Sequence, residues 1–246
     1  MVNNSDFIIR PDWPAPKSVN AISTTRLGGV SKDAYTSNNL AFHVGDDPSF
    51  VAKNREQLRL KCQFPNEPNW LTQIHSNTVV NFSDSNCEAD ASFSNQTQQV
   101  CVVMTADCLP ILICDNKGSQ VAAVHAGWRG LANNIVENTI DLFQRPASDI
   151  IAWLGPAIGA DHFEVGSDVK EAFVNGHESV AQYFKQTNEN KYLADLYGLA
   201  KLRLNQKGVT QIYGGEFCTY SDDTRFFSYR RDNVCGRMAS FIWLDK

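Results

Sequence analysis

The 246-residue sequence lacks several features that would place it in a familiar class. No basic segment followed by an apolar run stands at its start, which argues against a secretory signal peptide. Its longest apolar stretches are strand-sized and interrupted by Asp, Cys and His, so we expect no membrane-spanning segment. The net charge of −5 and the lack of a basic stripe argue against a protein that coats nucleic acid. A small positive pocket for phosphate is compatible with this balance.

Several catalytic and nucleotide-binding motifs are missing as well. The sequence has no GxxxxGK[ST] phosphate loop, no GxGxxG and no HExxH. His162-Phe163-Glu164 matches the first half of the zinc deaminase signature, but no PCxxC follows it. The five histidines are too few for the copper centres of a true multicopper oxidase.

The cysteine count indicates a cellular compartment. Seven cysteines without a signal peptide fit a reducing environment better than a disulfide framework, and an odd number excludes complete pairing. We therefore expect a cytoplasmic protein. Internal repeats and linker-like runs are lacking, and 43% hydrophobic residues are enough for one large core, so we predict a single domain over residues 1–246.

Short continuous apolar runs predict buried strands, and apolar residues at helical spacing predict helices. The predicted strands are 100–104, 110–114, 120–125, 150–154, 226–230 and 238–244. The predicted helices are 131–143, 167–175 and 192–206. Because strands and helices alternate irregularly, with hairpins among them, the pattern favours an α+β fold with mixed β-sheets packed between helices.

Three residues at predicted strand ends could hold a metal ion. His75 follows the apolar run 70–74, Cys108 lies in the turn between two strands, and His125 ends a strand. Two imidazoles and one thiolate, with a fourth position open, are typical of a catalytic zinc site. The spacings of 33 (108 − 75) and 17 (125 − 108) residues match no short metal motif. The alternative explanation is a buried core cysteine beside hydrogen-bonded histidines.

Arginines in turns are candidates for phosphate binding. Arg26 lies in the glycine-rich segment 24–29, Arg129 stands at the start of a predicted helix, and Arg230 lies near the C-terminal turn. A helix N-terminus and a nearby guanidinium both favour an anion. Solvated surface arginines are the alternative explanation for each of them.

The motifs together resemble the YfiH/laccase-domain family, also called the purine nucleoside phosphorylase family, which includes peptidoglycan editing factors. The matching segments occur in the expected order from residue 24 almost to the end of the chain. They are 24–31, 39–40, 44–48, 73–75, 105–110, 125–130, 155–159, 163–166 and 229–232. One departure is Asp161-His162, where relatives often carry cysteine.

The resemblance implies a YfiH-like fold and a zinc ion held by His75, Cys108 and His125. It also implies phosphorolysis of adenosine, inosine and methylthioadenosine, and deamination of adenosine. The implied partners are purine nucleosides and phosphate, with neither nucleic acid nor membrane. Older descriptions of the family name copper-dependent polyphenol oxidases, so copper is the alternative metal.

The leading hypothesis is a purine nucleoside phosphorylase with adenosine deaminase activity. It assigns catalytic roles to Cys108, His125 and Asp107, with the arginines above holding phosphate against the ribose. Trp128 and Phe42 are candidate lining residues of the pocket, and Glu164 is a second candidate proton carrier.

Three alternatives remain open at this point. One is a hydrolase that edits a peptidoglycan precursor, in which Cys108 is a nucleophile activated by His125. Another is a copper-dependent polyphenol oxidase. In the last, the metal only stabilises the fold and the protein is not an enzyme.

Overall fold

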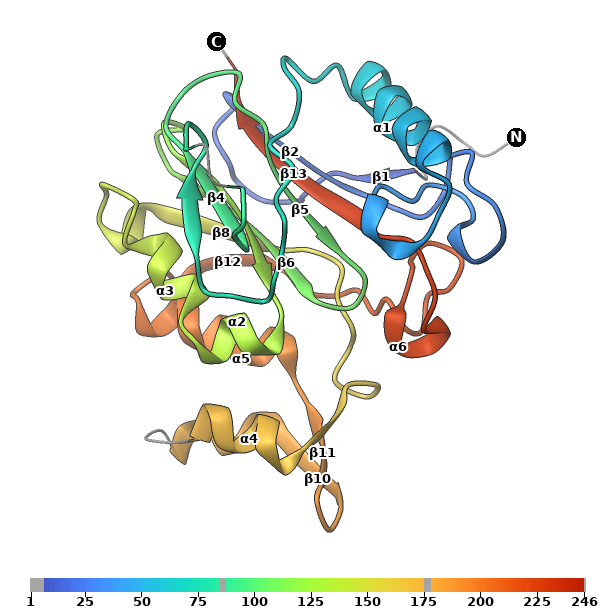
Figure 1. Cartoon of the computed structure of the whole chain (residues 1–246). Helices are drawn as coiled ribbons and strands as arrows, with labels where there is room; N and C mark the ends of the chain where they lie inside the picture. Colours follow the sequence, from blue (N-terminus) through green and yellow to red (C-terminus); the bar gives the residue numbers. More distant parts are fainter. Residues whose placement is uncertain (1–6, 85–86, 175–177, 246) are drawn as a thin grey trace.

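The computed structural model describes residues 7–84, 87–174 and 178–245, and their strands form three sheets (Figure 1). The strands are β1 Ile8–Ile9, β2 Val19–Thr24, β3 Val79–Asn81, β4 Ala91–Ser94, β5 Cys101–Thr105, β6 Leu109–Asp115, β7 Val121–Ala126, β8 Ile150–Leu154, β9 Glu164–Gly166, β10 Phe184–Asn188, β11 Lys191–Ala194, β12 Gln211–Gly214 and β13 Met238–Leu244. The α-helices are α1 Pro48–Cys62, α2 Trp128–Ala132, α3 Ile135–Ile140, α4 Ser167–Val174, α5 Leu196–Gln206 and α6 Tyr229–Asp232. The 3-10 helices are η1 Asp33–Tyr35, η2 Phe42–Val44, η3 Ala147–Asp149 and η4 Glu178–Tyr183.

The largest sheet is mixed and has the strand order β12-β8-β6-β7-β4-β3. Its outer pairs β12/β8 and β3/β4 are parallel, whereas its inner pairs are antiparallel. A second sheet, β1-β2-β13-β5, is antiparallel and joins strands from both ends of the chain. The third, β10-β11-β9, lies with α4 at one end of the molecule (Figure 1).

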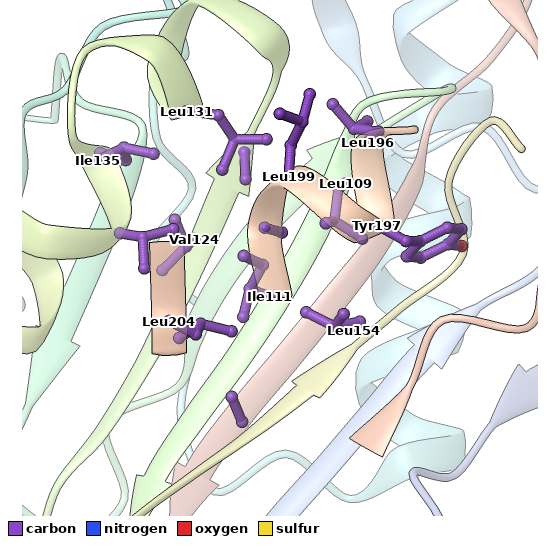
Figure 2. Close-up of a cluster of buried hydrophobic side chains, with 14 of the residues drawn as sticks. Leu109, Ile111, Val124, Leu131, Ile135, Leu154, Leu196, Tyr197, Leu199 and Leu204 are labelled. Carbon is purple, nitrogen blue, oxygen red and sulfur yellow. The ribbon is translucent and has the colours of Figure 1, made fainter. Parts of the chain in front are cut away.

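The two larger sheets pack face to face, and helices cover their outer faces. A buried cluster with Leu112 and Cys114 of β6 lies between these sheets. Leu109, Ile111 and Ile113 of the same strand point the other way, into the cluster that α2, α3 and α5 complete (Figure 2). The outer face of the second sheet packs against α1. Because both faces of β6 are buried, its sequence is a continuous apolar run. The predicted α+β class with mixed sheets between helices is confirmed.

The single helix predicted over 131–143 is wrong. The structure has two short helices, α2 and α3, separated at Asn133 and Asn134. Asn134 adopts a left-handed conformation with φ of 70°, which ends one helical segment before the next begins. The apolar spacing is nevertheless meaningful, because Leu131, Ile135 and Ile140 are all buried.

Two other predictions need correction. Residues 191–194 form strand β11, so the helix predicted over 192–206 begins only at Leu196, where the Asp195 carboxylate accepts a hydrogen bond from the Gly198 N–H. The strand predicted over 226–230 does not form. Ser228 instead caps the short helix α6 by accepting a hydrogen bond from the Arg231 N–H.

The remaining elements agree with the sequence patterns. The strands predicted at 100–104, 110–114, 120–125, 150–154 and 238–244 are confirmed, and each end agrees to within one residue. The helix predicted over 167–175 is present as α4, and residue 175 lies outside the described part of the chain. None of the helices in the described ranges has the length and apolar character that crossing a lipid bilayer requires.

Candidate metal centre

Three ligand-bearing side chains from separate elements meet beside the large sheet. His125 lies on β7, Cys108 immediately precedes β6, and His75 lies in the loop before β3. Strands β6 and β7 are antiparallel neighbours with Leu109 opposite Ala126, so the start of one strand lies beside the end of the other. This register brings Cys108 next to His125.

The donor atoms of His75, Cys108 and His125 lie within 4.8 Å of one another. The Cys108 sulfur is 4.0 Å from His75 Nε2, and the two imidazole rings meet edge to face with their centroids 4.9 Å apart. Tetrahedral zinc with bonds of about 2.0–2.3 Å holds its donors roughly 3.5 Å apart. Small side-chain adjustments therefore suffice for the three donors to share one ion.

A buried carboxylate fixes two of these ligands. Asp90 is 0% exposed, and its Oδ1 lies 2.7 Å from His125 Nδ1, which leaves Nε2 of that imidazole for a metal. The same carboxylate accepts hydrogen bonds from the backbone N–H groups of Ile74, His75 and Ser76, and from the Ser76 hydroxyl. Asp90 thus orients one histidine by its ring and the other by its backbone.

The electrostatics of the cluster favour a thiolate. Burial alone would raise the pKa of Cys108, but His125 and His75 outweigh it and lower this pKa to about 6. Burial alone would lower the pKa of His125, but Cys108 and Asp90 raise it to about 9. The thiolate is the form of cysteine that binds metals and attacks electrophiles.

Gly127 has no side chain, and this leaves room for the Cys108 and His75 side chains beside it. A Cβ atom at this position would lie 3.1 Å from the Cys108 sulfur and 3.2 Å from His75 Cδ2. Such contacts would push both ligands away from their present positions. The donor set, the oriented imidazole and this space together fit a zinc or copper ion.

The three ligands line a pocket of about 590 Å³. Most of its other charged side chains are basic, and three aromatic rings are also part of its wall. The basic residues are His43, Arg129, Arg230 and Arg237, and the aromatic residues are Trp128, Phe163 and Tyr229. Such a pocket can attract an anion such as phosphate by its positive charge, and its aromatic side chains can contact a planar ring.

Asp107, Arg129 and Arg230 lie in this pocket. One oxygen of the Asp107 carboxylate accepts a hydrogen bond from the Thr219 hydroxyl at 2.7 Å, and the other accepts one from the backbone N–H of Arg230 at 2.7 Å. Arg230 Nη1 donates to the carbonyl of Glu164 at 2.8 Å. The Arg129 guanidinium lies 4.4 Å from the Trp128 ring centroid. Asp107 therefore ties the turn that carries Cys108 to the helix that carries Arg230.

The structure does not bring Arg26 to the pocket wall. Its guanidinium donates to the carbonyls of Thr36 and Asp223, both at 3.0 Å, and lies over the ring of Phe227. Phe42 and Glu164 are not part of the pocket wall either, although the carbonyl of Glu164 holds Arg230.

The sequence analysis predicted no role for four residues near the ligands: Asp90, Gln73, His43 and Arg237. For Asp90 a signal existed, because a carboxylate stands between two alanines in the short stretch 89–93, which has no other charged residue. A buried acid of this kind needs partners. Gln73 pairs with the backbone of Met104 through both ends of its amide, which no pattern in the sequence indicates.

Comparison with known proteins identifies the family of this chain. The family model described as multi-copper polyphenol oxidoreductase laccase matches residues 20–245. A curated relative in Escherichia coli (strain K12), named purine nucleoside phosphorylase YfiH, is 50% identical over 240 residues, covering 96% of this chain and 98% of the relative. The purine nucleoside phosphorylase of Haemophilus influenzae is 52% identical over 241 residues, covering 96% and 99%.

Two solved structures share the fold. The crystal structure of Neisseria meningitidis protein NMB0706 superposes with a TM-score of 0.94 at 49% identity, covering 98% of this chain and 100% of that one. YlmD from Geobacillus stearothermophilus gives a TM-score of 0.87 at 28% identity, covering 95% and 94%. On its fold, its motifs and these matches, the chain belongs to the YfiH family, whose model is described as multi-copper polyphenol oxidoreductase laccase.

Proposed function

We propose that this protein is a zinc-dependent purine nucleoside phosphorylase that acts on adenosine, inosine and methylthioadenosine and also deaminates adenosine. The observation that carries the proposal is the meeting of His75, Cys108 and His125 in a pocket with basic and aromatic walls. The names of the relatives support the same reaction. The proposal includes action in the cytoplasm, where the seven free cysteines stay reduced.

Phosphorolysis breaks the bond between ribose C1′ and the purine nitrogen and forms a bond from C1′ to a phosphate oxygen, while the base nitrogen takes up a proton. Arg129 and Arg230 supply positive charge that attracts phosphate into the pocket and stabilises negative charge there. Trp128 and Tyr229 offer flat surfaces to the purine ring. A bound zinc ion supplies a Lewis acid for polarising a substrate oxygen or activating water.

Asp107 is the candidate proton carrier in this proposal. Both of its oxygens already accept hydrogen bonds, from Thr219 and from the backbone of Arg230. The carboxylate therefore also positions Arg230 relative to Cys108. Substitution by Asn would separate the two roles, because the amide keeps one acceptor and loses the charge.

The test is product analysis with zinc-loaded protein and adenosine, with and without phosphate. We expect adenine and ribose 1-phosphate only when phosphate is present, and inosine in both conditions. Cys108→Ala should abolish all three products because it removes a ligand. Cys218→Ala is the matched control, since this partly exposed thiol lies outside the metal pocket. Absence of turnover by zinc-loaded protein, or full turnover by Cys108→Ala, contradicts the proposal.

A second candidate is the Cys–His hydrolase, and one specific observation favours it. Asp90, His125 and Cys108 follow one another as orienting acid, base and thiolate, which is the order of a cysteine hydrolase triad. The substrate would be an amide, such as a peptidoglycan precursor. Zinc would then inhibit the enzyme by occupying the thiolate, so chelation should increase hydrolysis and added zinc should abolish it.

Copper-dependent polyphenol oxidation is the activity that the description of the family model suggests. In the described part of the chain, His75, Cys108 and His125 are the one group of ligands found that could hold a metal. Copper outcompetes zinc at many N/S sites, so oxidase activity could follow from loading with the wrong metal. If oxidase activity rises with copper content while nucleoside turnover does not, the oxidase activity results from loading with the wrong metal.

A further inference from the structure

Arg237 and His43 are two basic residues of the pocket wall to which the proposed function gives no role. They are far apart in the sequence, but hydrogen bonds join Arg237 to the segment that leads into His43. The Arg237 N–H donates to Asn39 Oδ1 at 3.0 Å, and the Leu40 N–H donates to the Arg237 carbonyl at 3.2 Å. Asn39 also accepts the Ala41 N–H at 3.0 Å, which fixes the start of η2. His43 is thereby held beside Arg237.

The guanidinium of Arg237 is anchored at one nitrogen. Its Nη1 donates to the carbonyls of Cys235 at 2.9 Å and Gly236 at 3.0 Å, and its Cζ lies 5.7 Å from the Tyr229 ring centroid. Within the described residues, Nε and Nη2 have no acceptor, and Arg237 forms no ion pair. This side of the guanidinium has the two parallel N–H groups that bind two oxygens of one phosphate.

The charge around this pair is not compensated. Partial burial lowers the pKa of His43, and the neighbouring Arg237 and Arg55 lower it further. Asp107 is the single carboxylate among the lining residues, and both of its oxygens are engaged elsewhere. A dianion would relieve the repulsion between these basic groups and would receive a further hydrogen bond from the imidazole.

We propose that Arg237 and His43 form a subsite for a phosphate dianion in the wall of the metal pocket. The subsite rests on the proposed function in one respect, namely that inorganic phosphate would be the co-substrate that occupies it. Arg237 holds two phosphate oxygens, and His43 donates to a third. The phosphate group of a nucleotide has the same chemistry, so the source of the dianion is part of the test.

The test is calorimetric titration of zinc-loaded protein with inorganic phosphate in the absence of nucleoside. Arg237→Met should weaken phosphate binding by about 10-fold to 100-fold, since a charge-assisted bidentate contact is lost. Arg237→Lys keeps the charge without the paired donors and should give a smaller loss. His43→Gln should weaken binding by roughly 3-fold to 10-fold, the range for one hydrogen bond. Arg59→Met, on the exposed surface of α1, is the control and should bind as the unmodified protein does.

A parallel titration with adenosine 5′-monophosphate distinguishes the two sources. Competition between the nucleotide and inorganic phosphate, with both affinities dependent on Arg237, supports a subsite open to either. Dependence on Arg237 for the nucleotide alone supports the subsite and assigns it to the phosphate group of a nucleotide. Equal binding of both ligands by Arg237→Lys, His43→Gln and the unmodified protein overturns the proposal.

These measurements remain separate from the proposed function because no turnover is needed. Phosphate binding that depends on Arg237, in a protein that cleaves no nucleoside, would contradict the phosphorylase and leave the subsite in place. Melting temperatures show whether each variant folds. If Arg237→Met unfolds, the two conservative variants carry the test.

Discussion

At the scale of single residues, Asp90 is the group on which the geometry of the candidate metal centre depends most. Its carboxylate contacts the His125 ring and three consecutive backbone N–H groups around His75. Partners of this kind fix the orientation of a metal ligand and increase its basicity. Burial alone would raise the pKa of Asp90, but hydrogen bonds from His125 and Ser76 lower it to about 2, so it stays ionised.

We expect Asp90→Asn to weaken zinc binding by about 10-fold to 100-fold, the usual effect of losing such a partner. The amide cannot accept all the hydrogen bonds that the carboxylate accepts, and it does not stabilise a polarised His125. Competition with a chromophoric chelator measures the affinity. Ser76→Ala, which removes one donor but keeps the contact with His125, is the control and should have a much smaller effect. Equal zinc affinity in Asp90→Asn and the unmodified protein would show that the contact is only structural.

At the scale of elements, the turn between β6 and β7 sets the register that places Cys108 beside His125. Asp115 ends β6 and is 0% exposed. Its carboxylate accepts hydrogen bonds from Ser119 N–H, the Ser119 hydroxyl and Gln120 N–H, and it pairs with Arg145 at 3.3 Å. Burial would raise its pKa, but these hydrogen bonds lower it below the ordinary 3.8.

Asp115→Asn should reduce the free energy of unfolding by about 1–3 kcal/mol at pH 7, because a buried charged acceptor is lost. A carboxyl whose pKa is lower in the folded state stabilises the protein above its ordinary pKa and loses this effect as the pH falls through the folded value. The difference in unfolding free energy between the variant and the unmodified protein should therefore be largest near neutral pH and become smaller below about pH 4. Urea unfolding at pH 7 and pH 3 measures it. A difference that grows in acid would contradict this account.

At the scale of the whole molecule, most of the buried apolar side chains lie away from the candidate metal ligands. The two larger sheets bury one cluster between them, and helices bury two more on their outer faces. The candidate ligands lie near the start of β6 and the end of β7, and they are not members of these apolar clusters. A metal bound there is expected to add stability to a fold that already exists.

Removal of zinc should therefore leave the protein folded, with a lower melting temperature. Free zinc at 100 times its dissociation constant adds about 2.7 kcal/mol to the free energy of unfolding. For a chain of this size that corresponds to roughly 5–10 °C. Circular dichroism should show unchanged secondary structure after chelation. Scanning calorimetry should show that the melting temperature returns to its original value when zinc is added. Unfolding on chelation would instead favour the non-enzymatic alternative, in which the metal stabilises the fold.

Local patterns were sufficient for much of this protein. The apolar runs at 100–104, 110–114 and 120–125 could become only buried strands, because their length is too short for a helix and both faces are apolar. The ordered motifs identified the family, which the comparisons confirm. Local patterns failed where a single capping or left-handed residue decided the element, as at Asn134, Asp195 and Ser228.

The sequence alone therefore determined the fold class, the family and the residue types available for a metal. The resemblance also named His75, Cys108 and His125 as joint ligands, but only the tertiary structure shows how they come together and which other side chains surround them. The β6/β7 register and the Asp90 carboxylate bring His75, Cys108 and His125 to one place, and the contact between Asn39 and Arg237 adds His43 to the pocket wall. Hydrophobic periodicity follows from neighbours along the chain, whereas a site follows from contacts between distant segments, which no short pattern encodes.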